Sequence, residues 1–384
     1  MSRILVEFEK WNSTTELTKK SLELVFSCES VAVRYKLIDE INMFDLDWCD
    51  SYIAIRPNTP LSEAFAKAIK EADRFYCVFF DDDLISRECV IKWRNRCSSS
   101  CLKIADIVIG VNSLLVGEYA LLTRRNRCHV IHTPLCVSEY HGVHKINERI
   151  QFVYAAGRDH AGYFEREIKP ILNRFLHKNH SKAHFTFIGV EPDIHELEHK
   201  ECFSFLPLMT LHEYNSTMMT TGFHVGLAPL DDTPFSNRKY YNKYIEYSKN
   251  GILGVYSNCL PYSLIVVDGE NGLLVNNSED DWLSALEKII SEPNLIQKCV
   301  RNAQQKLRIE HDIVRVKANM REAIPELYCH ECSKAIKWKK RKMKNGCFLL
   351  LDKLVKLYYS IVNDGLEKSA RKIMLHYNDT RRAK

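Results

Sequence analysis

Short apolar runs recur along the whole chain, separated by turn residues or by helical periodicity. In the first half they predict strands at Ile4–Phe8, Val31–Leu37, Ser51–Ile55, Phe75–Phe80, Ile107–Val111 and His129–His132. In the second half they predict strands at Ile150–Ala156, Ala183–Val190, Phe223–Leu230, Ile252–Ser257, Leu264–Val267 and Leu273–Val275. Helices are predicted at Tyr163–His177, Lys239–Lys249 and Trp282–Ser291, among others. This alternation of strands and helices predicts two α/β units.

One of the predicted helices begins with a concentration of positive charge. Arg238, Lys239 and Lys243 lie in or just before its first turns, after turn and cap residues that include Asn237. The unpaired N–H groups of a helix N-terminus favour an anion, so a diphosphate would be held there without a metal. Glu246 follows Lys243 on the same helix face, where a carboxylate would accept hydrogen bonds from two ribose hydroxyls. The pair also fits a solvated helix face.

The elements after this helix resemble the donor-binding domain of the retaining GT-B glycosyltransferases of family 4, also called glycosyltransferases group 1. In that family a helix with a Glu precedes a Gly, an apolar strand and an NGLLV-like turn, matched here by Glu246, Gly251, Ile252–Ser257 and Asn271–Val275. The resemblance implies two Rossmann-like domains facing across a cleft, and sugar transfer with retention of configuration. The basic start of the helix resembles a subgroup that assembles bacterial surface polysaccharides. Arg238 stands where the family often has a first Glu that contacts the sugar.

The resemblance also implies roles for individual residues. Glu246 would bind the ribose, and Lys239 and Lys243 would neutralise the diphosphate as charge develops on the leaving group. Family members often carry a His in the loop after the first strand of the donor domain, although a loop His is also common at a surface. The candidate catalytic residues are therefore Lys243, Lys239 and His160, and the candidate donor-binding residues are Glu246, Arg238, Arg158, Asn237 and Tyr262. Asp231, Asp232 and Thr233 would border the sugar or are ordinary turn residues.

Three consecutive aspartates, Asp81, Asp82 and Asp83, follow the apolar run RFYCVFF. An Asp-x-Asp after a strand is how metal-dependent GT-A glycosyltransferases hold manganese and a diphosphate, so a metal-dependent transferase using Asp81–Asp83 is an alternative. The donor-like half of the chain lies after residue 150, which favours a place for Asp82 and Asp83 near the cleft without metal. Arg56 ends the run SYIAI and would face the same cleft or pair with one of these aspartates.

The chain of 384 residues is long enough for two domains. We expect an acceptor-binding domain at 1–148, a donor-binding domain at 149–328 and a basic helical tail at 329–384. The Gly-rich loop that many family members carry after the first strand is absent, since residues 9–14 read EKWNST, so acceptor contacts are not assigned there.

Cysteine usage and hydropathy bear on metals and on the compartment. Fourteen scattered cysteines are typical of reduced, buried thiols and predict a cytoplasmic protein. Cys329 and Cys332 form one CxxC, and zinc would need further ligands such as Cys347 or His376, so we expect no metal and no cofactor. The start MSRILVEFEK lacks the apolar core of a signal peptide, and no apolar run is long enough to span a membrane.

The C-terminal tail holds the excess positive charge. Seven of the eleven residues from Lys334 to Lys344 are basic, and Cys347–Val362 has apolar residues at helical spacing. Such a segment is attracted to anionic lipid, which predicts peripheral contact of residues 334–362 with the cytoplasmic face of the inner membrane. A helix packed on the other domains explains the same pattern. No nucleic-acid module accompanies the charge, so no nucleic acid is expected.

Taken together, the sequence predicts transfer of a sugar from a nucleotide-sugar to a glycan or lipid-linked glycan. The alternative from another class is a catalytically idle GT-B-like protein that binds a glycan or acts as a scaffold. Arg238 keeps that alternative open, because the usual sugar-contacting Glu is absent.

Overall fold

A parallel six-stranded sheet forms the first half of the chain. The computed structural model describes residues 1–27, 29–85, 92–123, 127–130, 139–157 and 161–329, together with residues 350 and 354. The strands run in the order β2-β1-β3-β4-β5-β6. Their bounds are β1 Ser2–Phe8, β2 Val31–Leu37, β3 Ser51–Ile55, β4 Phe75–Phe80, β5 Ile107–Gly110 and β6 Arg127–Val130. All six predicted strands are present, although residues 131 and 132 of the last prediction lie outside the described residues.

Helices connect these strands and cover the sheet. They are α1 Ser13–Phe26, α2 Met43–Trp48, α3 Pro60–Glu71, α4 Lys92–Ile104 and α5 Ser113–Thr123, with a 3-10 turn at Ile38–Glu40. Side-chain caps fix where some of them begin: Asn12 accepts a hydrogen bond from the Thr15 N–H at the start of α1, and Thr59 precedes Pro60 at the start of α3. The central strands β3, β4 and β5 are buried along their whole length, which is why they read as continuous apolar runs.

The second sheet is also parallel, with the order β12-β11-β10-β7-β8-β9. Its strands are β7 Ile150–Ala155, β8 Ala183–Ile188, β9 Phe203–Leu206, β10 Val225–Ala228, β11 Leu253–Ser257 and β12 Leu273–Val275. Its helices are α6 Ala161–Tyr163, α7 Lys169–Asn179, α8 Leu211–Thr220, α9 Pro234–Asn237, α10 Asn242–Lys249, α11 Glu279–Ser291 and α12 Asn294–Glu310. The strand order reverses between β7 and β10, and ligands of open α/β sheets bind outside the carboxyl ends of strands at such a point.

The strand predicted at Leu264–Val267 is wrong. The chain forms a 3-10 turn at Tyr262–Leu264, and the N–H groups of Ile265 and Val266 donate to the carbonyl of Tyr262. The Val267 N–H donates to the side chain of Asn271 at 2.6 Å. These backbone donors are satisfied locally, so the apolar segment needs no neighbouring strand.

Two helices differ from their predicted bounds: one is divided and the other begins later. A π-helical turn at Phe164–Ile168 separates α6 from α7, because Pro170 has no N–H to continue the regular pattern and the Lys169 N–H donates back to the Phe164 carbonyl. The helix predicted at Lys239–Lys249 begins only at Asn242. Before it, Tyr240 and Tyr241 are buried with their rings 4.5 Å apart, and Tyr241 has a non-helical backbone.

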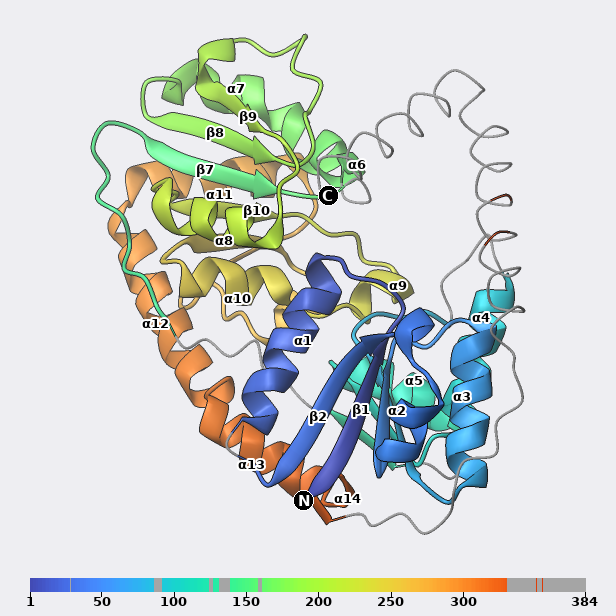
Figure 1. Cartoon of the computed structure of the whole chain (residues 1–384). Coiled ribbons are helices and arrows are strands. Elements are labelled where there is room, and N and C mark those ends of the chain that lie inside the picture. Colours follow the sequence, from blue (N-terminus) through green and yellow to red (C-terminus); the bar gives the residue numbers. More distant parts are fainter. Residues whose placement is uncertain are drawn as a thin grey trace.

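The two sheets share a core, and the last described helices return to the first sheet. One continuous cluster of buried residues contains side chains from the first sheet together with Tyr244 and Tyr256 of the second half. After α12, helices α13 Ile313–Ala323 and α14 Glu326–Cys329 pack on α1 and β1, so the chain crosses back along one side of the molecule (Figure 1). The predicted division at 1–148, 149–328 and 329–384 stays a prediction. Of the predicted tail helix, only Leu350 and Leu354 are described, and both are helical and exposed.

Candidate active site

Lys243 and Glu246 form the polar centre of the second half. Lys243 lies in the first turn of α10, and its Nζ is 2.7 Å from Oε2 of Glu246. The Tyr214 hydroxyl, contributed by α8, lies 3.0 Å from both of these atoms. Burial alone would lower the pKa of Lys243. The charge of Glu246 and the nearby Tyr247 raise it by more than burial lowers it, so the pKa lies above its ordinary value. Lys243 is therefore a permanent cation beside a carboxylate.

A cavity of about 360 Å³ opens beside this centre, at the carboxyl ends of β7 and β8. The second half lines its apolar part with Ala155, Ala156, Gly157, Ile188, Gly189, Leu208, Met209 and Leu211, and α1 of the first half adds Thr14 and Leu17. Its polar end is lined by Tyr214, Asn242, Lys243 and Glu246. Gly189 has φ +86, and a Cβ there would stand 2.7 Å from the Ala156 carbonyl oxygen, so a larger residue would not fit this wall. A mainly apolar cavity with a carboxylate in its wall suits a nucleoside, with the base against the apolar residues and the ribose at Glu246.

A second cavity, of about 370 Å³, lies between the two halves of the chain. The second half contributes Tyr163, Leu230, Phe235, Lys239, Tyr240, Asn242, Lys243, Glu246 and Tyr262. The first half contributes Thr14, Arg56, Asp81 and Asp82, which follow β1, β3 and β4. Both sheets thus direct the carboxyl ends of their strands at one cleft. Lys243 and Glu246 line both cavities, so a ligand that fills both would pass directly over them.

The three aspartates after β4 have different surroundings. Asp81 forms an ion pair with Arg56, whose backbone has φ +51. Asp83 is fully buried and pairs with Arg238 at 2.7 Å. Asp82, between them, accepts a hydrogen bond from the Asp83 N–H at 3.0 Å and lines the interdomain cavity. Arginines therefore neutralise two of the three carboxylates, a role that a metal ion would otherwise fill.

Arg238 and Asn237 lie apart from the two cavities. Arg238 follows α9, and its guanidinium reaches Asp83 and Glu118 of the first half; it is not among the residues that line either cavity. The Asn237 amide donates to Asp232 at 2.8 Å. That these two residues contact a donor stays a prediction. Asp231, by contrast, accepts hydrogen bonds from Ser236, Thr233 and Tyr163 and so holds the turn before α9 in place.

Other predicted residues fall outside the described part of the chain. His160 and Arg158 lie there, as does Cys332 of the CxxC. Within the described ranges, no group of three or more His, Cys, Asp or Glu residues has the arrangement to hold a metal ion. In the same part of the chain, no helix combines the length and the apolar character that crossing a bilayer requires.

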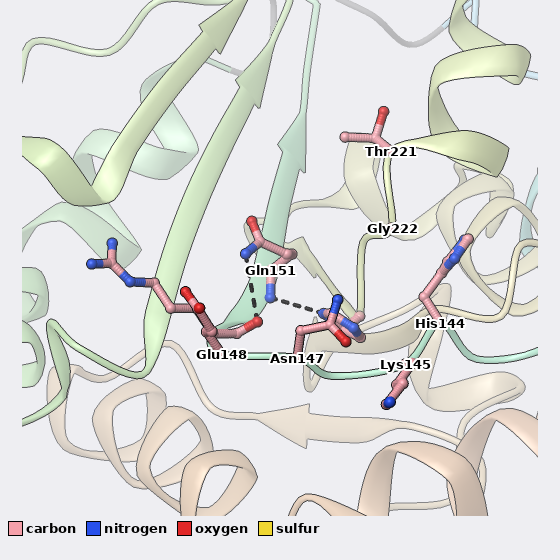
Figure 2. A pocket seen from close by; sticks show the side chains of 9 residues that line it. His144, Lys145, Asn147, Glu148, Gln151, Thr221 and Gly222 are labelled. Atoms are coloured by element: carbon pink, nitrogen blue, oxygen red, sulfur yellow. Dashed lines mark hydrogen bonds between the residues drawn. The ribbon is translucent and has the colours of Figure 1, made fainter.

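A third cavity, of about 640 Å³, lies at the opposite ends of β7 and β10 and contains none of the predicted residues. Figure 2 shows the residues around it, which come from the segment before β7, from β7 itself and from the segment before β10. His224 accepts a hydrogen bond from the Gln151 N–H at 2.9 Å, and His144 contacts the Met219 carbonyl at 3.0 Å. Its histidines are thus engaged with backbone groups.

Some lining residues were not predicted from the sequence. Tyr214 and Thr14 carry no local motif, and their place becomes visible only when α8 and α1 are packed against α10. Gly189 could have been found, because it lies within the strand predicted at Ala183–Val190, and a Gly inside a strand often marks a close approach of backbone to a ligand.

Comparisons with known proteins establish the fold. No protein-family model matches the chain, and no curated protein is significantly similar to it in sequence. Among solved structures, Anabaena Alr3699/HepE in complex with UDP-glucose superimposes with a TM-score of 0.64 at 13% identity, covering 85% of this chain and 100% of that one. The sucrose-phosphate synthase of Thermosynechococcus elongatus gives 0.62 at 12% identity, covering 85% and 99%. The lipopolysaccharide outer core galactosyltransferase WaaB gives 0.57 at 13% identity, covering 85% and 99%. The chain has the two-domain GT-B fold.

Proposed function

We propose that the chain is a glycosyltransferase that moves a sugar from a nucleotide-sugar to a glycan or lipid-linked glycan. The observation that carries the proposal is the meeting of two cavities at Lys243 and Glu246, one mainly apolar and one lined by charged residues of both halves of the chain. A nucleotide-sugar has the same sequence of parts, with a base, a ribose, a diphosphate and a sugar. The resemblance to a HepE structure that holds UDP-glucose supports the same class of ligand.

In this proposal, residues of α10 and of the neighbouring segments contact different parts of the donor. Glu246 accepts hydrogen bonds from the ribose through the carboxylate that Tyr214 orients. Lys243 and Lys239 lie on the cavity that continues past the ribose, where the diphosphate would pass. When the bond to the sugar breaks, negative charge grows on the terminal phosphate, and fixed cations in a partly buried site stabilise that charge more than they would in water. The Tyr262 phenol, whose pKa is raised by burial, stays protonated and lines the same cavity.

The proposed transfer is metal-independent and retaining, and it serves surface polysaccharide assembly at the membrane. Metal-independent transfer is supported by the lysines, which supply the positive charge that a divalent ion would otherwise provide. A role in surface polysaccharide assembly is supported by the likeness to WaaB, and retention by the sequence resemblance alone. Attachment to the cytoplasmic face of the inner membrane would depend on the basic residues 334–362. Activity that survives dialysis against EDTA is the expected result for a metal-independent enzyme.

The test has a binding step and a transfer step. A panel of nucleotides and nucleotide-sugars is screened by thermal shift, and we expect at least one to raise the unfolding temperature. With that donor, Lys243→Met and Glu246→Gln should lower transfer far more than the lost ion pair lowers the unfolding temperature of the free protein. Lys249→Met is the matched control, because Lys249 is on the same helix but lines neither cavity. If both site variants kept full transfer, the assignment of the site would be wrong.

The same experiment separates the enzyme from an idle scaffold. A scaffold that binds a glycan would bind no nucleotide-sugar, or would bind one without transferring or hydrolysing it. Release of free nucleotide from the stabilising donor, lost in Lys243→Met, would exclude the scaffold.

A further inference from the structure

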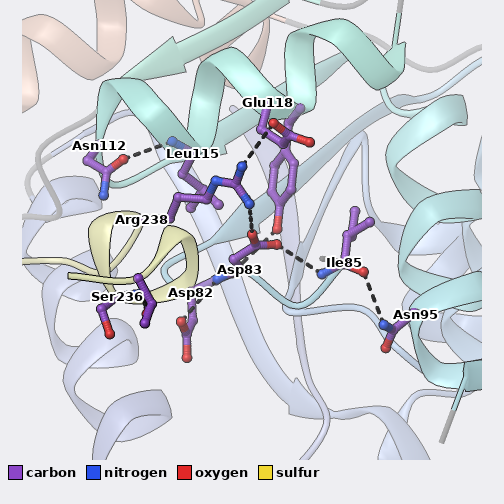
Figure 3. Close-up of polar contacts among 11 residues, drawn as sticks. Asp82, Asp83, Ile85, Asn95, Asn112, Leu115, Glu118, Ser236 and Arg238 are labelled. Carbon is purple, nitrogen blue, oxygen red and sulfur yellow. Dashed lines mark hydrogen bonds and ion pairs between the residues drawn. The ribbon is translucent and has the colours of Figure 1, made fainter. Parts of the chain in front are cut away.

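An ion-pair cluster joins residues 231–241 of the second half, here called the donor loop, to the first half. The Arg238 guanidinium lies between two carboxylates, with Nη1 at 2.7 Å from Oδ2 of Asp83 and Nη2 at 3.1 Å from Oε2 of Glu118 (Figure 3). Asp83 is completely buried, and the Arg238 side chain is only 19% exposed. A pair with so little exposure is screened far less by solvent and salt than a surface pair.

The next residue of the donor loop is held by the same part of the first half. Nδ2 of Asn112 donates to the carbonyl oxygen of Lys239 at 2.7 Å. Oδ1 of Asn112 accepts from the Leu115 N–H at 2.8 Å, which orients the amide at the start of α5. Two consecutive residues, Arg238 and Lys239, are thus fixed to α5 and to the end of β4, one by its side chain and one by its backbone.

The sequence neighbours of Arg238 and Asp83 line the interdomain cavity, one from each half of the chain. Lys239 follows Arg238, Asp82 precedes Asp83, and both Lys239 and Asp82 line the cavity. The Asp83 N–H donates to the Asp82 carboxylate, which ties the orientation of Asp82 to that of its buried neighbour. The Arg238–Asp83 pair therefore lies directly behind a cation of one half and a carboxylate of the other.

We infer that Arg238 is a positioning residue for the proposed transfer reaction, because its ion pair with Asp83 and Glu118 sets the spacing between Lys239 and Asp82 across the cavity. This inference rests on the proposed function. Arg238 needs no contact with the donor in this role, since it acts through Lys239. A lysine would supply charge but not the planar fork that reaches two carboxylates at once, and a carboxylate at this position would add a third negative charge to Asp83 and Glu118.

The consequence is a selective effect on the diphosphate. The apolar cavity that would take a nucleoside is built largely from the second half. Lys239, which would meet the terminal phosphate, is instead held to the first half by Asn112 and by the ion pairs of Arg238 with Asp83 and Glu118, here called the clamp. We expect Arg238→Met to weaken UDP binding about tenfold and UMP binding by no more than about twofold, measured by titration calorimetry. The UDP affinity of Arg238→Lys should lie between those of Arg238→Met and the unsubstituted protein. A purely structural defect would weaken both nucleotides alike, and that result would overturn the inference.

The control removes an ion pair that lies away from the interdomain cavity. Arg321 of α13, a helix that packs on α1, pairs with Glu29, and neither residue lines that cavity, so Arg321→Met should leave the ratio of UDP to UMP affinity unchanged. The double variant Asp83→Asn/Arg238→Met also removes the charge of the buried carboxylate that loses Arg238 in the single variant. It should fold well and still show the selective loss of UDP affinity. Recovery of UDP affinity in the double variant would mean that the buried negative charge of Asp83, not the missing ion pair, caused the loss.

A failure of the proposed function is distinguishable from a failure of the clamp. If the unsubstituted protein binds neither UDP nor UMP, and the pairs ADP/AMP and GDP/GMP also fail, the proposed donor site is wrong. The clamp is then decided by amide hydrogen exchange. Faster exchange in Arg238→Met confined to residues 81–85 and 233–241, and absent in Arg321→Met, supports it. Unchanged exchange in both segments overturns it.

Discussion

Glu7 is a buried carboxyl group that should make the stability of the protein depend on pH. It lies on β1 with only 1% of its surface exposed, and it accepts hydrogen bonds from the Tyr52 and Ser62 hydroxyls. Burial raises its pKa from the ordinary 4.5 to about 7, and the two hydrogen bonds offset only part of that rise. The perturbation that tests this is Glu7→Gln, which keeps the shape and removes the titration.

The direction of the effect follows from which state holds the proton. Below about pH 4.5 the carboxyl is protonated in both the folded and the unfolded chain, so its titration changes nothing. Between about pH 4.5 and 7 the folded protein keeps the proton and the unfolded chain releases it, so the free energy of unfolding falls as the pH rises. A pKa difference of about 2.5 at about 1.4 kcal/mol each corresponds to a loss of about 3 kcal/mol, complete above pH 7.

Urea unfolding followed by tryptophan fluorescence between pH 5 and pH 8.5 measures this loss. We expect the stability of Glu7→Gln relative to the unsubstituted protein to rise by about 2 to 3 kcal/mol across that range. Glu71→Gln, at an exposed position of α3, removes the same charge and serves as the control. If the difference between Glu7→Gln and the unsubstituted protein did not change with pH, Glu7 would be ionised in the folded state and the reasoning would be refuted.

Two further substitutions test the packing around the site. Gly251→Ala should destabilise the protein by more than about 1 kcal/mol, because Gly251 has φ +73 and a Cβ would stand 2.2 Å from the Gly142 carbonyl oxygen. Gly269→Ala is the control, since Gly269 has a similar φ of +69 but open space around it. The difference between the two variants in thermal unfolding measures the effect of the clash alone. Tyr214→Phe removes a hydroxyl that contacts two charged groups, a contribution of about 1.5–3 kcal/mol to the stability of the folded protein. Because Glu246 also loses the group that orients it, nucleotide affinity measured by calorimetry should fall. Unchanged affinity would show that the hydroxyl does not orient Glu246.

The sequence predicted most of the sheet architecture because parallel strands buried on both faces are continuous apolar runs. β4 and β11 are examples, each buried at every position. Leu264–Val267 has the same composition and is not a strand, since its N–H groups find partners within the turn and on Asn271. Composition reports that a segment is buried, but the partner of each backbone donor is decided by the surrounding chain.

The same distinction applies to the candidate site. The spacing of Lys243 and Glu246 placed them on one helix face, and the structure joins them at 2.7 Å. The partner of Arg238 could not be found in this way, because Asp83 lies 155 positions earlier in the chain. Contacts within a helix follow from its period, whereas contacts between the halves depend on how two sheets come together.

The return of α13 and α14 to the first sheet has a consequence for synthesis of the protein. Val316, Met320, Ile324 and Leu327 belong to the same buried cluster as Phe26 of α1. The strands of the first sheet are complete at Val130, yet the side chains that finish their covering are made nearly two hundred residues later. At about 5–20 residues per second, a nascent chain would wait roughly 10–40 seconds with that apolar surface uncovered. During this interval the first half is a natural substrate for chaperones.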